Sequence, residues 1–304
     1  MRRIRHDFFL FFVSILTAAG LAGCLETAAE GAQPGTADRG PTSIPLDGDP
    51  NGLRLLPDGT LLIADDNNNR VLAYVDGDGT SLYAELPTAA ANGPGLGDIA
   101  LLNDGRLVMP RFGFGTAGDV VVVEADKTSR VVPNLDATRR RLGAAQGLDG
   151  TVYISGFTVT GDGVKLGSVW RLDLDTGTET SVIDGLKKPV GLLVVGDALY
   201  IADQERKEIS RGTLPALNDI VVIATGLPSA DLLSAGPAGS LFTGSKDGDV
   251  YRIDGDRFEL AFDGLQEARG TAYDADNTRL FVADHDGEET DGVTHALRIF
   301  PVDG

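Results

Sequence analysis

Residues 51–65 read NGLRLLPDGTLLIAD, and residues 68–76 follow with NNRVLAYVD. In the first stretch, apolar runs flank Pro57-Asp58-Gly59, and Asp-Gly between two such runs is a strong hairpin signal. The second stretch supplies a third apolar run, and SLYAEL at residues 81–86 supplies a fourth. Four short strands joined by tight turns predict one antiparallel blade of a larger all-β fold.

The end of the second run recurs along the chain and marks a repeat. The marks are separated by 46, 45, 47, 41 and 40 residues and fall at Asp65, Arg111, Gly156, Asp203, Gly244 and Asp284. Propeller blades repeat at about this length. Six repeats in residues 42–304 therefore predict an all-β, six-bladed β-propeller with four antiparallel strands per blade. A β-sandwich or barrel is the competing fold, but neither explains a repeat of this length.

The two ends of the repeat array predict how the ring closes. The last repeat supplies only three strands and ends in LRIFP at residues 297–301, whereas TSIPL at residues 42–46 has no hairpin partner. We therefore expect the N-terminal strand to complete blade six. Closure of this kind leaves only short, protected strand edges.

The composition limits the possible partners. The chain has 304 residues, 40 of them glycine, and a formal net charge of -19. Frequent glycine is consistent with many tight turns. A phosphate backbone would be repelled by so acidic a surface, so nucleic acid is excluded as a partner. The acidity is explained by solubility and solvated turns, with halophily or cation binding as the alternatives.

The N-terminus carries the features of an export signal. Arg2, Arg3 and Arg5 precede an apolar run over residues 8–19 that is too short to span a bilayer. Residues 21–24, LAGC, resemble the lipobox of bacterial lipoproteins. The resemblance implies cleavage before Cys24 and lipid attachment to it; an ordinary signal peptide with a chance cysteine is the alternative.

This interpretation divides the chain into three parts. Residues 1–23 are expected to be a lipoprotein signal peptide, residues 24–41 a lipidated cysteine and flexible tether, and residues 42–304 the propeller. Cys24 is the only cysteine, so no internal disulfide can form in an oxidising compartment. The expected location is the cell envelope, anchored to a membrane through lipid. Leu25, by resemblance to the sorting rule of two-membrane bacteria, favours the outer membrane, on its periplasmic or surface face.

The repeat also indicates a family. Residues 52–65 followed by Asn68-Asn69-Arg70-Val71 resemble an NHL repeat, and Ala202-Asp203 echoes it in a later blade. About 260 residues resemble, at the level of pattern, the NHL and gluconolactonase/senescence-marker-protein superfamily of six-bladed propellers. That superfamily contains both enzymes and binding modules, so the fold alone does not decide the activity.

The resemblance implies a divalent cation, often calcium, on the propeller axis. The matching positions in this chain are Asn51, Asp98, Gln146 and Asp231. The family's first-blade glutamate has no convincing counterpart here. The charge of Arg269 would oppose metal binding if this side chain points inward. A segment over residues 47–58 also has nearly the spacing of a calcium loop, but its Asp and Asn residues are equally typical of turns.

One face of the ring is expected to carry the ligand site. The longer excursions follow the second strand of each blade or join two blades, and rigid scaffolds place binding residues on such loops. A ligand-binding face is therefore predicted at Arg111, Phe112, Phe114, Phe157 and Asp284, although these aromatics could instead pack beneath their own loops.

A histidine and three aspartates at or beside the repeat marks are expected to have different roles. His285 is the candidate catalytic base, with a surface histidine as the alternative. Asp65, Asp203 and Asp284 recur at equivalent positions, which indicates that they accept backbone N–H bonds in the turn after the second strand.

Two functional hypotheses follow from these observations. The first is a membrane-anchored binding or scaffold module for a small ligand, a glycan or a protein. The alternative is a calcium-dependent hydrolase of the gluconolactonase type, using Asn51, Asp98, Gln146 and Asp231, with His285 as a further catalytic residue. The absence of a full calcium-ligand set favours the first hypothesis.

Overall fold

The computed structural model describes residues 41–90, 94–286 and 295–302. They belong to one compact unit. The predicted signal peptide, Cys24 and nearly all of the tether lie outside the described residues. Within those residues, no helix is long and apolar enough to cross a membrane.

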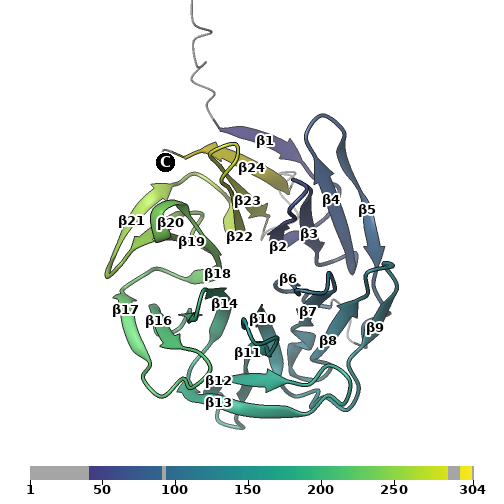
Figure 1. Ribbon diagram of the computed structural model, residues 1–304, viewed down its shortest axis with the longest axis vertical. Helices are drawn as coiled ribbons and strands as arrows, with labels where there is room; N and C mark the ends of the chain where they lie inside the picture. Colours follow the sequence, from purple (N-terminus) through teal and green to yellow (C-terminus); the bar gives the residue numbers. More distant parts are fainter. Residues whose placement is uncertain (1–40, 91–93, 287–294, 303–304) are drawn as a thin grey trace, which may run out of the picture. The chain divides into compact units, whose positions relative to one another are not determined.

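The described residues form six four-stranded antiparallel sheets arranged as a six-bladed β-propeller (Figure 1). Blades one to three contain β2 (Pro50–Leu55), β3 (Leu61–Asp65), β4 (Arg70–Val75), β5 (Gly79–Glu85), β6 (Ala100–Leu101), β7 (Leu107–Arg111), β8 (Asp119–Val123), β9 (Ser129–Val131), β10 (Arg140–Gln146), β11 (Val152–Val159), β12 (Lys165–Leu172) and β13 (Glu179–Leu186). Blades four to six contain β14 (Pro189–Val195), β15 (Ala198–Asp203), β16 (Glu208–Thr213), β17 (Val221–Thr225), β18 (Ala230–Ala235), β19 (Leu241–Ser245), β20 (Val250–Asp254), β21 (Arg257–Phe262), β22 (Glu267–Asp274), β23 (Arg279–His285), β24 (Ala296–Pro301) and β1 (Thr42–Pro45). Two single 3-10 turns, η1 (Gly113–Gly115) and η2 (Pro237–Gly239), complete the set. The predicted fold is confirmed.

The ring closes as expected from the sequence. Strand β1 pairs antiparallel with β24, with Thr42 opposite Ile299 and Pro45 opposite Ala296. Blade six is therefore built from both ends of the described chain. The six second strands end at or close to the six repeat marks, at Asp65, Arg111, Val159, Asp203, Ser245 and His285.

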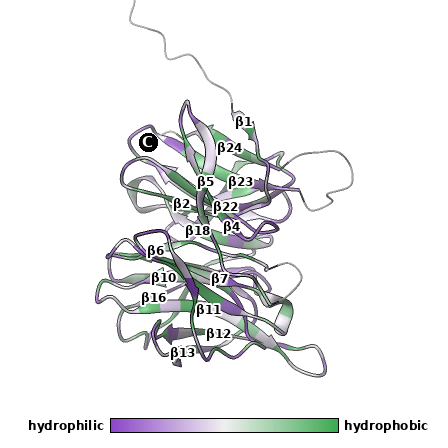
Figure 2. Cartoon of the chain, turned by 90° about the vertical axis from the view of Figure 1, so that its right-hand side faces the viewer, coloured by the Kyte–Doolittle hydropathy of each residue, from purple (hydrophilic) through white to green (hydrophobic). Residues whose placement is uncertain are grey.

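The apolar core is divided among the six junctions between neighbouring blades. In β3 every residue is buried, and alternate side chains point to opposite faces of the strand. Leu61 and Ile63 pack with blade six around Phe281, whereas Leu62 packs with blade two around Met109. An unbroken apolar run such as LLIA is therefore required by a strand that is covered on both sides. Figure 2 shows hydrophobic residues concentrated along these strands and polar residues in the connections.

Glycines allow the innermost strands to approach one another at the axis. A Cβ atom on Gly97 would lie 2.4 Å from the carbonyl oxygen of Leu142, and one on Gly270 would lie 2.4 Å from that of Asn51. Each of these distances is too short for any other residue type. Five blades carry a glycine at this junction: Gly52, Gly97, Gly143, Gly191 and Gly270. The narrow axis of the ring is thus specified directly by residue type.

The recurring aspartates tie the entry of each blade to its second strand. Asp65 accepts the backbone N–H of Asp49 (2.9 Å), and Asp203 accepts those of Lys187 (2.7 Å) and Lys188 (3.0 Å). The expected structural role is therefore present, but most of these donors precede the first strand instead of following the second. The antiparallel hairpin explains this, because it places the end of the second strand beside the start of the first.

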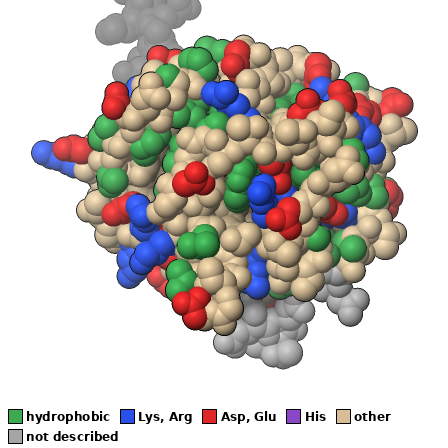
Figure 3. Space-filling view, turned by 90° about the horizontal axis from the view of Figure 1, so that it is seen from below, with side chains coloured by type: hydrophobic (Ala, Val, Ile, Leu, Met, Phe, Trp, Pro, Cys, Tyr) green, Lys and Arg blue, Asp and Glu red, His purple; other side chains and the backbone are tan. Residues whose placement is uncertain are grey.

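The excess negative charge is dispersed. On the side of the propeller seen in Figure 3, acidic and basic side chains are interspersed with apolar ones. Many of the acids sit in tight turns, where Asp58, Asp126 and Asp149 accept the N–H of the residue two positions later.

Candidate functional site

Two hollows lie on the propeller axis, one on each face. We call the side where β2 begins and β3 ends the loop face, and the side of the first-to-second-strand turns the hairpin face. The loop face is the one on which the sequence places the ligand site. The inner strands run from one face to the other, so residues near the start of each strand line the loop-face hollow and later residues line the hairpin-face hollow. The two hollows therefore differ in the side chains that line them.

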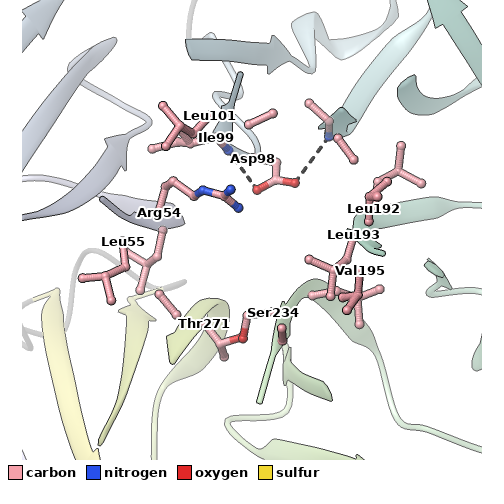
Figure 4. A pocket seen from close by; sticks show the side chains of 18 of the residues that line it. Arg54, Leu55, Asp98, Ile99, Leu101, Leu192, Leu193, Val195, Ser234 and Thr271 are labelled. Atoms are coloured by element: carbon pink, nitrogen blue, oxygen red, sulfur yellow. Dashed lines mark hydrogen bonds between the residues drawn. The ribbon is translucent and has the colours of Figure 1, made fainter. Parts of the chain in front are cut away.

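The hairpin-face cavity is the larger and has a volume of about 460 Å³. Aliphatic residues and polar groups both line it, and Figure 4 labels Ser234 and Thr271, whose hydroxyl groups share a hydrogen bond (2.7 Å). Arg54 and Asp98 are its charged residues, and their side chains extend toward each other from neighbouring blades (Figure 4). The polar side chains of this cavity are thus largely engaged with one another or with the backbone.

The Asp98 carboxyl group is held by the backbone. It accepts the N–H groups of Ile99 (2.8 Å) and Ala144 (3.3 Å), and the residue is only 8% exposed. Burial raises the pKa of Asp98 to about 7, although both amides and the Arg54 charge oppose the shift. The same burial lowers the pKa of Arg54 from its ordinary value.

The four predicted axial ligands are not brought together. Gln146 lies at the hairpin end of β10, where it donates to the Gly150 carbonyl (3.0 Å) and accepts the Asn103 N–H (2.8 Å). Asp98 lines the hairpin-face cavity, whereas Asn51 and Asp231 line the loop-face pocket. Backbone groups near Asp98 and Gln146 hold both side chains on the hairpin side, away from Asn51 and Asp231.

A guanidinium group stands beside the remaining candidates. Arg269 Nη1 lies 3.2 Å from Asp231 Oδ2, and its Nη2 contacts Glu267. The amide nitrogen of Asn51 donates to the Leu96 carbonyl (2.9 Å). Calcium requires about six to eight oxygen ligands. Two side chains, one of them already paired with a cation, do not fit an axial calcium ion.

The loop-face pocket has a volume of about 190 Å³ and is rich in cations. Lys188, Lys246 and Arg269 line it, and Asp66 and Asp231 are its carboxylates. Arg269 is paired with acids, but neither lysine forms a salt bridge among the described residues. The pocket thus has a local excess of positive charge in a chain whose net charge is -19.

Lys188 shows the effect of this environment most clearly. Its Nζ donates to Gln204 Oε1 (2.5 Å), and both residues line the pocket. Burial, followed by repulsion from Lys246, lowers the pKa of Lys188 to about 8. A bound anion would relieve both effects, since it would compensate the buried charge and screen the neighbouring one.

Asp66 is the acid–base candidate of the pocket. Its Oδ1 accepts the Leu96 N–H (2.6 Å), and Oδ2 has no hydrogen-bond partner among the described residues. Burial raises the pKa of Asp66 to about 6, and the nearby Asp49 charge adds to the shift. A carboxyl group with a pKa close to neutrality is well suited to accept and return a proton.

His285, the predicted base, also lines this pocket. Its Nδ1 contacts Asp49 Oδ1, and His295 Nδ1 lies 3.7 Å from the same oxygen. The three side chains therefore form a compact group at the pocket rim. The catalytic role of His285 stays a prediction.

The predicted aromatic residues divide into pocket and core. Phe112 and Phe114 line the pocket and meet edge to face, with ring centroids 5.2 Å apart. Phe157 is only 1% exposed and packs beneath Phe112, at a centroid distance of 5.9 Å. Arg140 lies over both Phe112 and Phe157. Two of the three predicted aromatics thus line the pocket, and the third packs beneath Phe112.

Two residues predicted for the ligand face are buried in the framework instead. Arg111 is 1% exposed, forms a two-point ion pair with Asp119 and donates to the Pro87 carbonyl (2.7 Å). Asp284 accepts the Gln266 N–H (2.7 Å), and burial raises its pKa above the usual value. Both stand at repeat marks, where an inward side chain reaches backbone groups of the preceding connection and not solvent.

The sequence analysis did not single out Asp66, Lys188 or Lys246. Asp66 directly follows a structural aspartate, and Lys188 directly precedes the first residue of an inner strand. Asp66 and Lys246 follow closely after the repeat marks Asp65 and Gly244, so these marks were an available signal for them but not for Lys188. Their charges converge only because the ring brings the connections of different blades to one axis.

Comparisons with known proteins bear on the fold. No protein-family model matches the chain, and no curated protein matches it significantly. A gluconolactonase from Xanthomonas campestris matches with a TM-score of 0.62 and 18% identity, over 86% of this chain and 98% of that one. Regucalcin from Agrobacterium tumefaciens, described as a calcium-binding protein, matches with a TM-score of 0.64 and 14% identity, over 85% and 92% of the two chains.

A third similar structure has a different chemistry. Virginiamycin B lyase from Staphylococcus aureus matches with a TM-score of 0.56 and 16% identity, over 85% of this chain and 98% of that one. At these identities the likeness establishes the fold. The protein is a six-bladed propeller similar to gluconolactonase-like propellers, as the resemblance in its sequence implied.

Proposed function

We propose that this protein is a small-molecule hydrolase of the lactonase type whose substrate carries a negative charge. The observation that carries the proposal is the loop-face pocket itself. It places a buried carboxyl group with a pKa of about 6, Asp66, in the same small hollow as Lys188, Lys246 and Arg269. The similar gluconolactonase structures support a hydrolase over the binding or scaffold module that the sequence first favoured.

The reaction can be written with the residues of the pocket. Asp66, ionised at neutral pH, accepts a proton from water as the water oxygen bonds to the lactone carbonyl carbon. The Lys246 ammonium group stabilises the negative charge that develops on the carbonyl oxygen in a poorly solvated site. The ring C–O bond then breaks, and the leaving oxygen takes the proton from Asp66. The product is a hydroxy acid, and Asp66 is ionised again.

The remaining cations account for the expected substrate charge. Arg269 is already paired with Asp231, so Lys188 is the group that a carboxylate or phosphate on the substrate would meet. The edge-to-face pair of Phe112 and Phe114 gives the rest of a small ring an apolar surface.

The experiment compares lactones that differ only in charge. Hydrolysis of a neutral γ-lactone and of the same lactone bearing a carboxylate is followed by acid release. We expect Lys188→Met to lower kcat/KM for the carboxylated lactone by about 10- to 100-fold, the loss of one charged hydrogen bond, and to affect the neutral lactone much less. Asp66→Asn should lower kcat by at least about 100-fold on both.

The pH dependence and a matched control sharpen the result. Lys188 is protonated below its pKa of about 8, so its selectivity for the carboxylated lactone should decline as the pH rises through that value. Lys127→Met, a lysine on the hairpin face beside Tyr83, is the control. Binding of the hydroxy acid without turnover of any lactone would favour the binding-module hypothesis. The absence of both binding and turnover would refute the proposed anion-binding pocket.

A further inference from the structure

Asp49, His285 and His295 converge at the rim of the loop-face pocket from three separate segments. Asp49 immediately precedes β2, His285 ends β23, and His295 immediately precedes β24. Each offers one ligand atom, and these atoms all lie within 4.8 Å of one another. The two imidazole rings are tilted by 50°, with centroids 5.3 Å apart. Three side chains are thus directed at one point from two blades.

Two of the converging atoms are buried without a hydrogen bond. Asp49 Oδ1 and His285 Nδ1 touch, but neither has a hydrogen-bond partner of acceptable geometry. The Asp49 side chain is only 5% exposed, so water does not easily replace the missing partner. A buried acceptor left in this way is costly, and a cation shared by both atoms would satisfy them together.

The backbone holds the carboxylate in place before any ligand arrives. Asp49 donates its N–H to Asp65 Oδ1 (2.9 Å), and its carbonyl accepts the Asp66 N–H (2.8 Å). Asp65 is in turn paired with Arg70 (2.6 Å). The position of Asp49 is therefore set by the same framework contacts that join the first two strands of blade one.

A backbone contact holds His295 at this position. Its Nδ1 accepts the Asp286 backbone N–H (2.9 Å), so the lone pair of this nitrogen is directed at that amide. Coordination through Nδ1 would replace that hydrogen bond. The cost is one amide contact, and the gain is a bond from imidazole nitrogen to a cation.

We propose that Asp49, His285 and His295 form a binding site for a divalent transition-metal ion. Two imidazoles and one carboxylate suit zinc, iron, cobalt, nickel or manganese, and they leave further coordination positions open. Calcium is disfavoured, because it prefers oxygen ligands and more of them. The site differs from the axial one that the sequence resemblance implies, since it shares none of the residues Asn51, Asp98, Gln146 and Asp231.

The metal site borders the pocket of the proposed hydrolase. His285 lines both, and the charges of Asp49 and His285 act on the Asp66 carboxyl group. An open coordination position would face the region where a substrate is expected. Metal binding itself does not depend on the proposed function and can be tested in the absence of any substrate.

The test is a titration of the full chain, freed of metal by chelation, with Co²⁺ and Zn²⁺. Visible absorption reports the geometry of bound cobalt, and calorimetry gives the zinc stoichiometry and affinity. We expect one ion per chain, together with a rise in melting temperature on zinc addition. His285→Ala and His295→Ala should each weaken metal binding by at least about 100-fold. Substituting a residue that only positions a ligand usually costs less than this.

Three comparisons keep the result interpretable. Asp49→Asn retains the shape of the side chain but weakens a ligand, so its loss of affinity is not explained by misfolding if the circular dichroism spectrum is unchanged. Asp58→Ala, on an exposed turn of the hairpin face, is the control. Asp231→Ala separates this site from an axial one.

The outcomes divide cleanly. The site is supported if the wild type binds one ion per chain, the Asp49, His285 and His295 variants lose it, and Asp58→Ala retains it. Binding that is lost in Asp231→Ala and kept in both histidine variants overturns it. A folded wild-type chain that binds calcium alone, or that binds neither cobalt nor zinc, also overturns it and leaves Asp49 and His285 as an ion pair without a metal. Lactone turnover is not used as a readout, so failure of the proposed function would leave this result unaffected.

Discussion

Replacing Asp98 by asparagine should remove a strong pH dependence from the stability of the propeller. Burial raises the pKa of this carboxyl group from 3.8 to about 7 in the folded chain. Between these values the folded chain holds a proton that the unfolded chain has lost, so stability falls as the pH rises through this window. At 1.36 kcal/mol for each pKa unit, the full effect is about 4 kcal/mol.

The asparagine variant has no such proton to lose. Its single amide oxygen can accept one of the two N–H groups of Ile99 and Ala144, so the variant should be less stable than the wild type by about 1 kcal/mol near pH 4. Above about pH 8 the wild type carries a buried charge and the variant does not, so the order should reverse by about 3 kcal/mol. The difference between the two proteins, and not either curve alone, isolates Asp98 from the other carboxylates.

The assay is urea unfolding at several pH values, followed by the fluorescence of the buried Trp170 and by circular dichroism. Asp104→Asn, at an exposed turn where the carboxylate meets Arg106, is the matched control and should show no reversal. A constant difference between Asp98→Asn and the wild type across the range would refute the reasoning. It would mean that Asp98 is ionised in the folded chain at ordinary pH, as a calcium ligand would be.

Two further predictions concern residues whose sequence-based roles need separate tests. Arg111→Met should destabilise the propeller by about 3–5 kcal/mol in urea unfolding, because it leaves Asp119 without its buried partner, whereas Arg106→Met on the surface should cost less than about 1 kcal/mol. If Arg111→Met instead spared stability and removed ligand binding, the original ligand-face assignment would be right. We also propose that lipid on Cys24 anchors the protein to the cell envelope, so Cys24→Ser should abolish labelling by a fatty-acid analogue and move the chain from the membrane fraction to the soluble one. An equally labelled variant in the membrane fraction would contradict that anchor.

Much of the architecture could be predicted because its signals are local. The hairpin of residues 51–65 carries its own turn, and the same pattern returns at each blade. Leu61 and Leu62 are both apolar because neighbouring blades cover both sides of their strand. Even ring closure was visible, since β1 lacked a hairpin partner and blade six lacked a strand.

The candidate site was only partly accessible to the same reasoning. Phe112, Phe114, Asn51, Asp231 and His285 do line the loop-face pocket. Gln146 was placed on the axis by its position in the repeat, but a strand crosses from one face to the other and Gln146 lies at the wrong end. Arg111 was predicted on the ligand face because it stands where a long connection begins, whereas Asp119 and the Pro87 carbonyl hold its side chain inside the blade.

By itself, the sequence determined the number of blades, the strand order, the closure of the ring and the acidic character of the chain, because turn residues, strand periodicity and repeat length act over a few neighbouring positions. Only the tertiary structure decided which charges meet. Lys188 and Lys246 come from different blades, and Asp49 and His295 come from opposite ends of the described chain, yet each pair lies at one rim. The pKa of Asp66 and the contacts of Asp49 depend on burial and on through-space neighbours, which no local pattern specifies.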